Sequence, residues 1–266
     1  MKNNKYKILV LSDLKEGTNI AIKNAVSLSK IISADIELFY VRKPTDIVER
    51  ESQLSAMRTI NQEYLVIERN IKKILEPISK SYDVKLKSSF AFGNVKSEIK
   101  DYIEASQPDI IVLGQRVSNP FQLRGTSITS FLLKEYEGII VISSNNNSLI
   151  PNEKVALGVL NGSKKMLDTE FFKELIPHSK TPLKSFKIIN SQKENGKTPR
   201  LNKKEMVEFV FEKNINSITT LSKYLVKNKI NLLCVNRVKN TQNSIESPLK
   251  EVVNKLNISL LISRVL

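Results

Sequence analysis

One order of elements occurs twice along this chain, and the repeat limits the fold more than any other feature. Short apolar runs rich in branched residues alternate with helix-like stretches through residues 7–142, and a similar series begins again at residue 155. Strands that alternate with helices favour a parallel sheet wrapped by helices. A repeat of roughly 120–145 residues is too long for a solenoid. The sequence therefore predicts two tandem α/β units.

The first half carries the clearer pattern. We expect strands at 7–12, 36–41, 84–92, 109–113 and 138–142, and helices at 18–34, 54–80, 95–106 and 128–136. The strands are short apolar runs bounded by polar residues, as is typical of strands buried in a parallel sheet. Thr18 or Asn19 is expected to cap the first helix. Pro77 is expected to end or kink the second helix early.

The second half repeats this order in a trimmed form. Strands are expected at 155–161 and 183–190, with a helical stretch at 166–176 between them. A polar loop at 192–200 stands where the first half has its long helix. The second copy is therefore expected to lack that helix.

The closing portions of the two halves align best. Residues 90–116 match 209–237, and residues 138–143 match 258–263. Residues 143–153 have the composition of a linker. The predicted fold is therefore two tandem flavodoxin- or Rossmann-like domains, at 1–146 and 147–266. Each is expected to be a mostly parallel sheet of about five strands with helices on both faces.

Charge and composition limit the classes of partner. The formal net charge is +15, but the lysines are spread along a chain that is also rich in Asn and Ile. Compositional bias alone can produce this pattern, so we do not expect a specific nucleic-acid partner. The charge still attracts polyanions in general, nucleotide phosphates included.

Three further features favour the cytoplasm. The sequence has no apolar run of about 18 residues, so no membrane span is predicted. The N-terminus runs from a short basic lead into a strand, without the pattern of a signal peptide. The single cysteine, Cys234, excludes an intrachain disulfide. We therefore expect a cytoplasmic protein.

The residues that could bind a ligand follow the strands of the first half. Ligands of open parallel sheets bind beyond the carboxyl ends of the strands. Asp13, Val41 and Gly114 follow or end three of these strands and are expected to meet there. Gly114 also opens a loop that closes with Gly125 and Thr126 at the start of a helix. Glycine permits close approach of the backbone, and a helix N-terminus offers free N–H groups to a phosphate.

Other side chains of this loop suit a phosphate as well. Thr126 or Ser127 adds a hydroxyl donor, and Arg116 and Arg124 are close enough in sequence to screen phosphate charge. Gly, Thr and Ser before a helix also act as plain capping residues, so both interpretations stay open at this point.

Here the first half resembles the universal stress protein family. The resemblance covers residues 7–143 and, more faintly, 155–264. It rests on ILVLSD before a helix, on ADIELFYV, on the region of Gly93 and on DIIVLGQR…RGTSITSFLLKEYEGIIVIS. It implies a stress-response sensor or regulator of the cytoplasm that binds ATP or a related adenine nucleotide, with Mg²⁺ held only through the nucleotide.

The family's ATP-binding members carry the motif G-x2-G-x9-G-[ST], and the resemblance assigns roles by position. Asp13 matches the acidic residue near the ribose, and Val41 matches the residue whose backbone contacts adenine. Gly114 matches the first glycine of the motif. Gly125 and Thr126 match its closing pair, whose amides and hydroxyl hold phosphate.

This sequence departs from the motif in two ways. Val117 stands where the second glycine belongs, and the stretch from Gly114 to Gly125 is two residues shorter than the motif. A valine is strained wherever φ must be positive. One hypothesis is a variant nucleotide site; the alternative is an interaction module that keeps the fold and has lost the site. An enzyme of the wider superfamily is the third hypothesis, and we expect no enzyme beyond slow ATP hydrolysis.

The second half departs further from the motif. Asn161 stands in the place of Asp13, and Cys-Val-Asn-Arg at 234–237 replaces Leu-Gly-Gln-Arg at 113–116. Ser247 and Pro248 occupy the place of the Thr126–Ser127 pair without a preceding glycine. Proline is accepted at a helix start but removes one amide donor. We expect no phosphate binding in this half.

The resemblance also predicts how the halves meet. Single-domain members of the family pair as dimers through their last strand. The apolar runs at 138–143 and 258–263 are expected to pair in the same way within one chain, which would protect two sheet edges. An internal pseudo-dimer results, and it leaves further association and a regulatory protein partner open.

The remaining reactive side chains suggest no chemistry. His178, the single histidine, lies between Pro177 and Ser179 without a nearby pair of metal ligands. Cys234 lies in an apolar strand and is expected to be a buried thiol. No spacing typical of a metal site or a catalytic triad is present.

Overall fold

In the computed structural model the described residues are 4–43, 53–115, 127–162, 164–189, 206–237 and 247–264. The first half contains β1 (Tyr6–Ser12), α1 (Gly17–Ile32), β2 (Ala34–Arg42), α2 (Gln53–Tyr82), β3 (Leu86–Phe92), α3 (Val95–Ser106), β4 (Ile110–Gly114), α4 (Ile128–Glu135) and β5 (Ile139–Ser143). The second half contains β6 (Leu157–Leu160), α5 (Lys164–Leu167), α6 (Glu170–Leu175), the 3-10 turn η2 (Ile176–His178), β7 (Leu183–Ile189), β8 (Met206–Glu212), α7 (Ser217–Lys227), β9 (Leu232–Asn236), α8 (Ser247–Lys255) and β10 (Ser259–Ser263).

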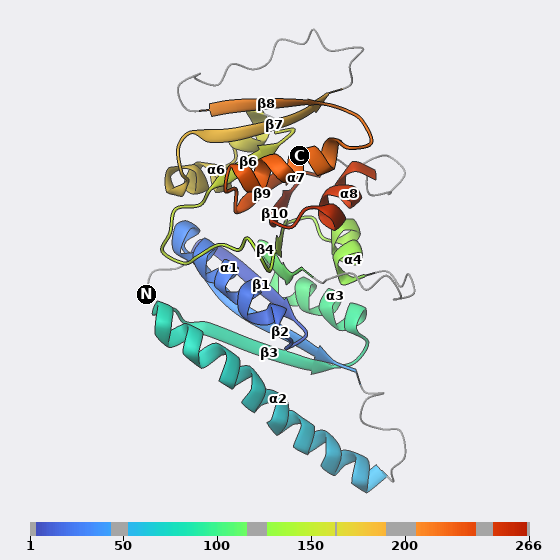
Figure 1. Cartoon of the computed structure of the whole chain (residues 1–266). Coiled ribbons are helices and arrows are strands. Elements are labelled where there is room, and N and C mark those ends of the chain that lie inside the picture. The colour runs from blue at the N-terminus through green and yellow to red at the C-terminus, as the bar shows by residue number, and fades with distance from the viewer. Residues whose placement is uncertain are drawn as a thin grey trace.

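One continuous sheet joins the two halves (Figure 1). The strand order of the described residues is β3-β2-β1-β4-β5-β10-β9-β6-β7-β8, so each half repeats the same five-strand order about the centre. Strands within each half pair in parallel. β5 and β10 pair antiparallel, with Val141 opposite Leu261. The predicted tandem α/β fold and the pairing of the two closing strands are confirmed.

Helices cover both faces of this sheet. α1, α2, α5 and α6 pack on one face, and α3, α4, α7 and α8 pack on the other. Each of the two hydrophobic cores contains side chains from both halves of the chain. Burial of this apolar surface is the main stabilising contribution, and it couples the halves directly.

The linker lies packed against the first half. Asn24 of α1 is fully buried, and its Oδ1 accepts a hydrogen bond from the backbone N–H of Leu149 at 3.0 Å. Leu149 is also buried. Lys5, directly before β1, forms ion pairs of 2.6 Å with both Glu170 and Glu174 of α6. These contacts add to the strand pairing between the halves.

The predicted cap of the first helix and the predicted early end of the second helix at Pro77 are wrong. α1 begins at Gly17, and Thr18 is buried with its hydroxyl turned to Ser12 instead of capping the helix. α2 continues beyond Pro77 to Tyr82. A proline inside a helix costs about 3 kcal/mol. Buried isoleucine and leucine side chains on both sides of Pro77 hold the helix against the sheet, and they are Ile67, Ile71, Leu75 and Ile78.

The predicted helix at 166–176 is divided. It forms α5 and α6, followed by the turn η2. Thr169 has extended backbone angles at the start of α6, and its hydroxyl donates to the carbonyl of Met166 at 2.8 Å. This local hydrogen bond competes with the helical ladder, as threonine often does.

Candidate functional site

The strand order reverses between β1 and β4, and this reversal defines the candidate site. From β1 the chain proceeds outward to β2, whereas β4 lies on the other side of β1 and leads to β5. Leu11 pairs with Leu113, so the residues that follow them, Asp13 and Gly114 among them, lie at the same edge of the sheet. Such a switch point opens a crevice at the carboxyl ends of the strands.

A tight turn fixes Asp13 at this edge. The Asp13 carboxylate accepts a hydrogen bond from the backbone N–H of Lys15 at 3.1 Å. The Ser12 hydroxyl accepts from the N–H of Leu14 at 2.9 Å and lies 2.7 Å from the Thr18 hydroxyl. Leu14 takes the left-handed conformation, with φ of 58°. The sequence did not single out Ser12 and predicted only a helix cap for Thr18, although the two side chains orient the turn that carries Asp13.

Gly114 ends β4 beneath the first residue of α1. A Cβ atom at position 114 would lie 3.3 Å from the carbonyl oxygen of Gly17. The φ of Gly114 is not positive. Glycine is therefore favoured here by lack of space, not by backbone conformation, and the start of α1 closes over the end of β4.

Val41 lies on a part of β2 that extends past β1. The last pair between these strands is Ser12 with Tyr40, whereas β2 and β3 remain paired through Val41 with Ala91 and Arg42 with Phe92. The side of Val41 that faces β1 therefore has no strand partner. The structure brings Val41, Asp13 and Gly114 to one edge of the sheet, as expected.

Ser127 caps α4, the helix that follows β4 in the chain. Its hydroxyl accepts from the backbone N–H of Ser130 at 3.1 Å, and Ser127 itself is exposed. Ser143, which pairs with Gly114, is fully buried, and its hydroxyl bonds no described atom. Four predicted residues, namely Arg116, Arg124, Gly125 and Thr126, lie outside the described residues, as does Val117.

Strand register corrects the alignment of the two halves by one residue. Leu11 pairs with Leu113, and Leu160 pairs with Val235, so Asn161 corresponds to Ser12 instead of Asp13. By the same register, Asn236 corresponds to Gly114. The predicted loss of the loop glycine in the second half stands, with asparagine in its place.

The corresponding edge of the second half is closed by a side chain. Asn161 is in the left-handed region, with φ of 47°. Its Oδ1 accepts from the backbone N–H of Ile188 at 2.9 Å. Phe39 pairs with Leu11 of β1, and Phe186 pairs with Leu160 of β6, which corresponds to Leu11. Val41 and Ile188 each lie two residues after these phenylalanines, so the two residues correspond. The Asn161 side chain thus bonds the backbone N–H that corresponds to the N–H of Val41.

Solved structures with the same architecture exist. A universal stress protein from Archaeoglobus fulgidus is similar over 98% of this chain and 97% of its own, with a TM-score of 0.68 and 13% identity. A functionally unknown protein from Pseudomonas aeruginosa is similar over 97% of this chain and 92% of its own, with a TM-score of 0.60 and 11% identity. These likenesses show a shared tandem fold. No curated protein matches the chain.

A family comparison decides the relationship. The model of the universal stress protein family matches residues 6–137. The chain belongs to the universal stress protein family. The match falls on the half in which Asp13, Val41 and Gly114 converge, and the second half carries the same strand order.

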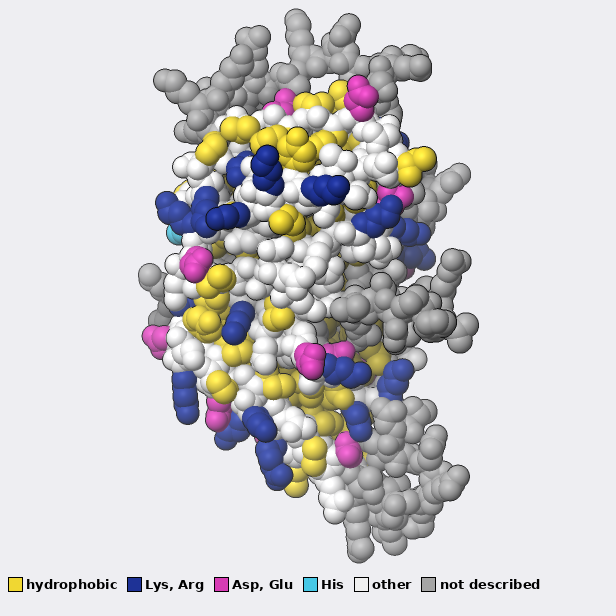
Figure 2. Space-filling view, in the orientation of Figure 1, with side chains coloured by type: hydrophobic (Ala, Val, Ile, Leu, Met, Phe, Trp, Pro, Cys, Tyr) yellow, Lys and Arg dark blue, Asp and Glu magenta, His cyan; other side chains and the backbone are white. Residues whose placement is uncertain are grey.

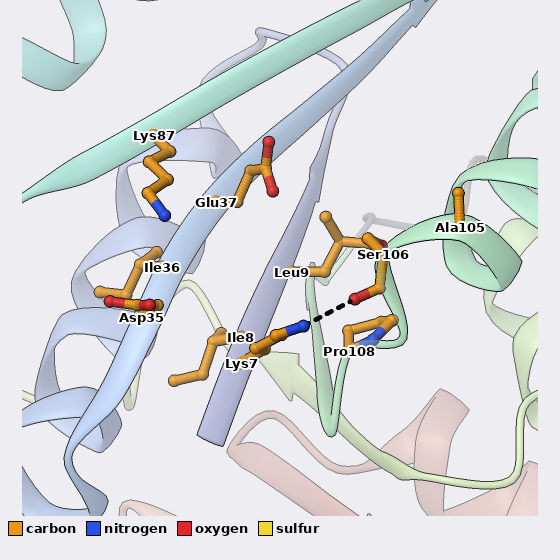
Figure 3. Close-up of a pocket in the computed structure, with 10 residues that line it drawn as sticks. All are labelled: Lys7, Ile8, Leu9, Asp35, Ile36, Glu37, Lys87, Ala105, Ser106 and Pro108. Carbon is orange, nitrogen blue, oxygen red and sulfur yellow. Dashed lines mark hydrogen bonds between the residues drawn. The ribbon is translucent and has the colours of Figure 1, made fainter. Parts of the chain in front are cut away.

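A separate hollow of about 260 Å³ lies at the other edge of this universal stress fold, at the amino ends of β1, β2 and β3 (Figure 3). Its charged side chains are Lys7, Asp35, Glu37 and Lys87. Strand register sets Lys7 opposite Asp35 and Glu37 opposite Lys87, so the charges alternate in sign. The Glu37 carboxylate accepts from Ser89 and Tyr102, each at 2.6 Å. This hollow is remote from the candidate nucleotide site and its charge is balanced.

The remaining groups play structural roles. Cys234 is fully buried in β9, and burial raises the pKa of its thiol well above the ordinary value, which leaves it unreactive in the folded chain. His178 ends the turn η2. In the part of the chain that the structure describes, no three His, Cys, Asp or Glu side chains gather into a metal site.

The surface agrees with the interpretation of the charge. Figure 2 shows Lys and Arg side chains scattered over the visible face, interleaved with acidic and apolar groups, and not gathered into one stripe. Among the described helices, none is long and apolar enough to cross a bilayer.

Proposed function

We propose that this member of the universal stress protein family binds ATP or a related adenine nucleotide at the switch point of its first half. The observation that carries the proposal is the convergence of Asp13, Val41 and Gly114 beyond the carboxyl ends of β1, β2 and β4. Nucleotides bind at this place in open α/β sheets. The protein acts as a stress-response sensor or regulator in the cytoplasm.

The roles proposed for the individual residues follow from the resemblance to the family. Asp13 faces the ribose, and the unpaired side of the Val41 backbone contacts the adenine. Gly114 lets the start of α1 pack closely against the end of β4 beside the phosphates, and Arg116 screens their charge. Gly125, Thr126 and Ser127 hold phosphate at the start of α4, where the free N–H groups of a helix favour an anion. Mg²⁺ enters only with the nucleotide.

The domains divide these tasks unequally. Residues 1–146 form the nucleotide-binding domain, and 147–266 form a degenerate partner domain. The hydrogen bond from Ile188 N–H to Asn161 supports this division, because it occupies a group that the base would need. Binding, with at most slow hydrolysis, is the activity: among the described residues that follow β1, β2 and β4, the carboxylate assigned to the site is that of Asp13, and it accepts a bond from the turn that holds it.

Calorimetry with ATP and Mg²⁺ tests the proposal. The wild-type chain is expected to bind one nucleotide, and Gly125→Val is expected to abolish the heat of binding. Gly196→Val is the control, because it makes the same glycine-to-valine change in the polar loop of the second half. This variant is expected to bind ATP like the wild type. No binding by the wild type at millimolar nucleotide contradicts the proposal. That result supports the interaction module, which Val117 and the shortened loop would then explain.

A further inference from the structure

The two halves cap each other's last helix through corresponding residues. Gln115 follows β4, and its Nε2 donates to the carbonyl of Leu256, at the end of α8, at 3.0 Å. Arg237 follows β9, and its guanidinium donates to the carbonyls of Leu133 at 2.7 Å and Tyr136 at 2.6 Å, at the end of α4. The backbone N–H groups of Gln115 and Arg237 also make matching bonds to the last residues of β5 and β10.

A second pair of contacts follows the same symmetry. Ser144, directly after β5, donates its hydroxyl to Asn257 at 2.9 Å. Arg264, directly after β10, forms an ion pair with Glu137. The first half thus holds α8 with neutral groups, whereas the second half holds the end of α4 with two arginines.

The arginine contacts are the stronger ones. Arg237 is only 9% exposed, and burial lowers the pKa of its guanidinium, which nevertheless stays charged. The C-terminal end of a helix carries partial negative charge and free carbonyls, which favour a cation there. Charge-assisted hydrogen bonds are about twice as strong as neutral ones. The clamp on α4 is therefore firmer than its counterpart on α8.

α4 links this clamp to the candidate site. The helix spans Ile128–Glu135, so its capped start at Ser127 lies about 12 Å from its clamped end. A short helix moves as a rigid body, and displacement at one end displaces the other. Gln115 directly follows β4, before the segment that leads to α4, and it also bonds the second half, through the carbonyl of Leu256.

We propose that the degenerate second half is a positioning element for the nucleotide site of the first half, acting through Arg237 and Arg264 on α4. Its regulatory part rests on the proposed nucleotide binding. Arg237 is a positioning residue, since it contacts α4 and not the site itself. A loss of these arginine contacts is thereby transmitted to the nucleotide affinity of the first half.

Hydrogen exchange in the absence of nucleotide tests the clamp by itself. Arg237→Met keeps the aliphatic bulk and removes the donors, and it is expected to speed amide exchange across α4 at least tenfold relative to α3. Leu225→Ala is the control, because it truncates a fully buried side chain of α7 in the second half and leaves both arginines in place. At conditions adjusted to equal melting temperature, this variant keeps α4 exchange at the wild-type rate. Arg237→Lys, which retains a cation, restores part of the protection.

Nucleotide titration of the same variants tests the coupling. Arg237→Met is expected to raise the Kd for ATP about tenfold, and Leu225→Ala to leave it within twofold. Unchanged α4 exchange in Arg237→Met overturns the clamp whether or not ATP binds. Faster exchange with an unchanged Kd overturns the coupling. Faster exchange in a chain whose wild type binds no ATP supports the clamp and refutes the nucleotide proposal alone.

Discussion

The two halves share a strand order but differ at the edge where we propose that the first half binds nucleotide. In the first half Asp13 and Gly114 lie at the same edge of the sheet, and β2 extends past β1 at Val41. In the second half Asn161 bonds the corresponding strand end, and Asn236 stands where Gly114 stands. The first half also carries the long helix α2, which has no counterpart among the described residues of the second half.

The difference shows how the second domain keeps the fold while its residues at the strand ends change their contacts. The core side chains of the second half remain apolar and buried, which preserves the sheet. Its polar residues at the strand ends are committed to contacts within the chain. Asn161 closes its own crevice, and Arg237 holds the last helix of the other half. We infer that the second half supports a site that it no longer forms.

The largest expected effect comes from breaking the shared sheet. Leu261→Asp places a carboxylate in a fully buried strand opposite Val141. It is expected to lower the free energy of unfolding by about 4 kcal/mol, because a buried charge lacks a partner there. Urea unfolding measures the loss. Val210→Asp on β8, at a side chain that is 54% exposed, is the control and is expected to cost less than about 1 kcal/mol.

The same unfolding curves separate one cooperative unit from two. Both cores contain residues of both halves, so loss of circular dichroism and thiol labelling of Cys234 are expected to coincide. Labelling of Cys234 at a lower urea concentration than the loss of helix would show that the second half unfolds by itself.

The reciprocal caps predict an unequal pair of effects. Arg237→Met leaves buried helix carbonyls without donors and is expected to cost about 3 kcal/mol. Gln115→Met removes one neutral bond and is expected to cost about 1 kcal/mol. Thermal unfolding of both variants checks the order. Equal costs would contradict the unequal clamp.

Substitutions of Asp13 and Asn161 test the predicted difference in nucleotide binding between the two halves. Asp13→Ala is expected to weaken ATP binding about tenfold, which corresponds to about 1.4 kcal/mol. Asn161→Ala frees the N–H of Ile188 but supplies no acidic residue or glycine, so the stoichiometry is expected to stay at one. Titration calorimetry measures both. A second binding event in Asn161→Ala would show that Asn161 alone closes the second site.

The smallest effect is expected from the glycine at the end of β4. Gly114→Ala places a methyl group 3.3 Å from the Gly17 carbonyl, and is expected to cost about 1 kcal/mol of stability. Asn236→Gly, the reverse change in the second half, is expected to leave nucleotide binding unchanged. Chemical unfolding and titration check these two variants. A loss of more than about 3 kcal/mol in Gly114→Ala would mean that α1 cannot move aside.

The sequence predicted the elements because these follow from local patterns, and the resemblance to the family predicted the pairing of the two closing strands. Strand runs and helical stripes depend on side-chain periodicity within a few residues. The errors arose where tertiary contacts decide. Thr18 bonds Ser12 instead of capping α1, and α2 passes Pro77 because its packed face continues beyond it.

The candidate site could be predicted only in part. Asp13, Val41 and Gly114 were found because strand ends and glycine are visible in the sequence. The one-residue shift of Asn161 was not visible, because register depends on hydrogen bonds between strands. Arg237 carried no signal beyond its place in the repeat, since its partners lie about 100 residues away in the chain, as the separations of 104 and 101 show.

A structure of the chain crystallised with ATP and Mg²⁺ would show whether only the first half binds nucleotide. One nucleotide per chain is expected, with its base against Val41, its ribose near Asp13 and its phosphates beside Gly114 and Ser127. The edge at Asn161 and Asn236 is expected to stay empty. A nucleotide bound at the second half, or none at either half under millimolar ligand, would contradict the division of tasks between the two halves.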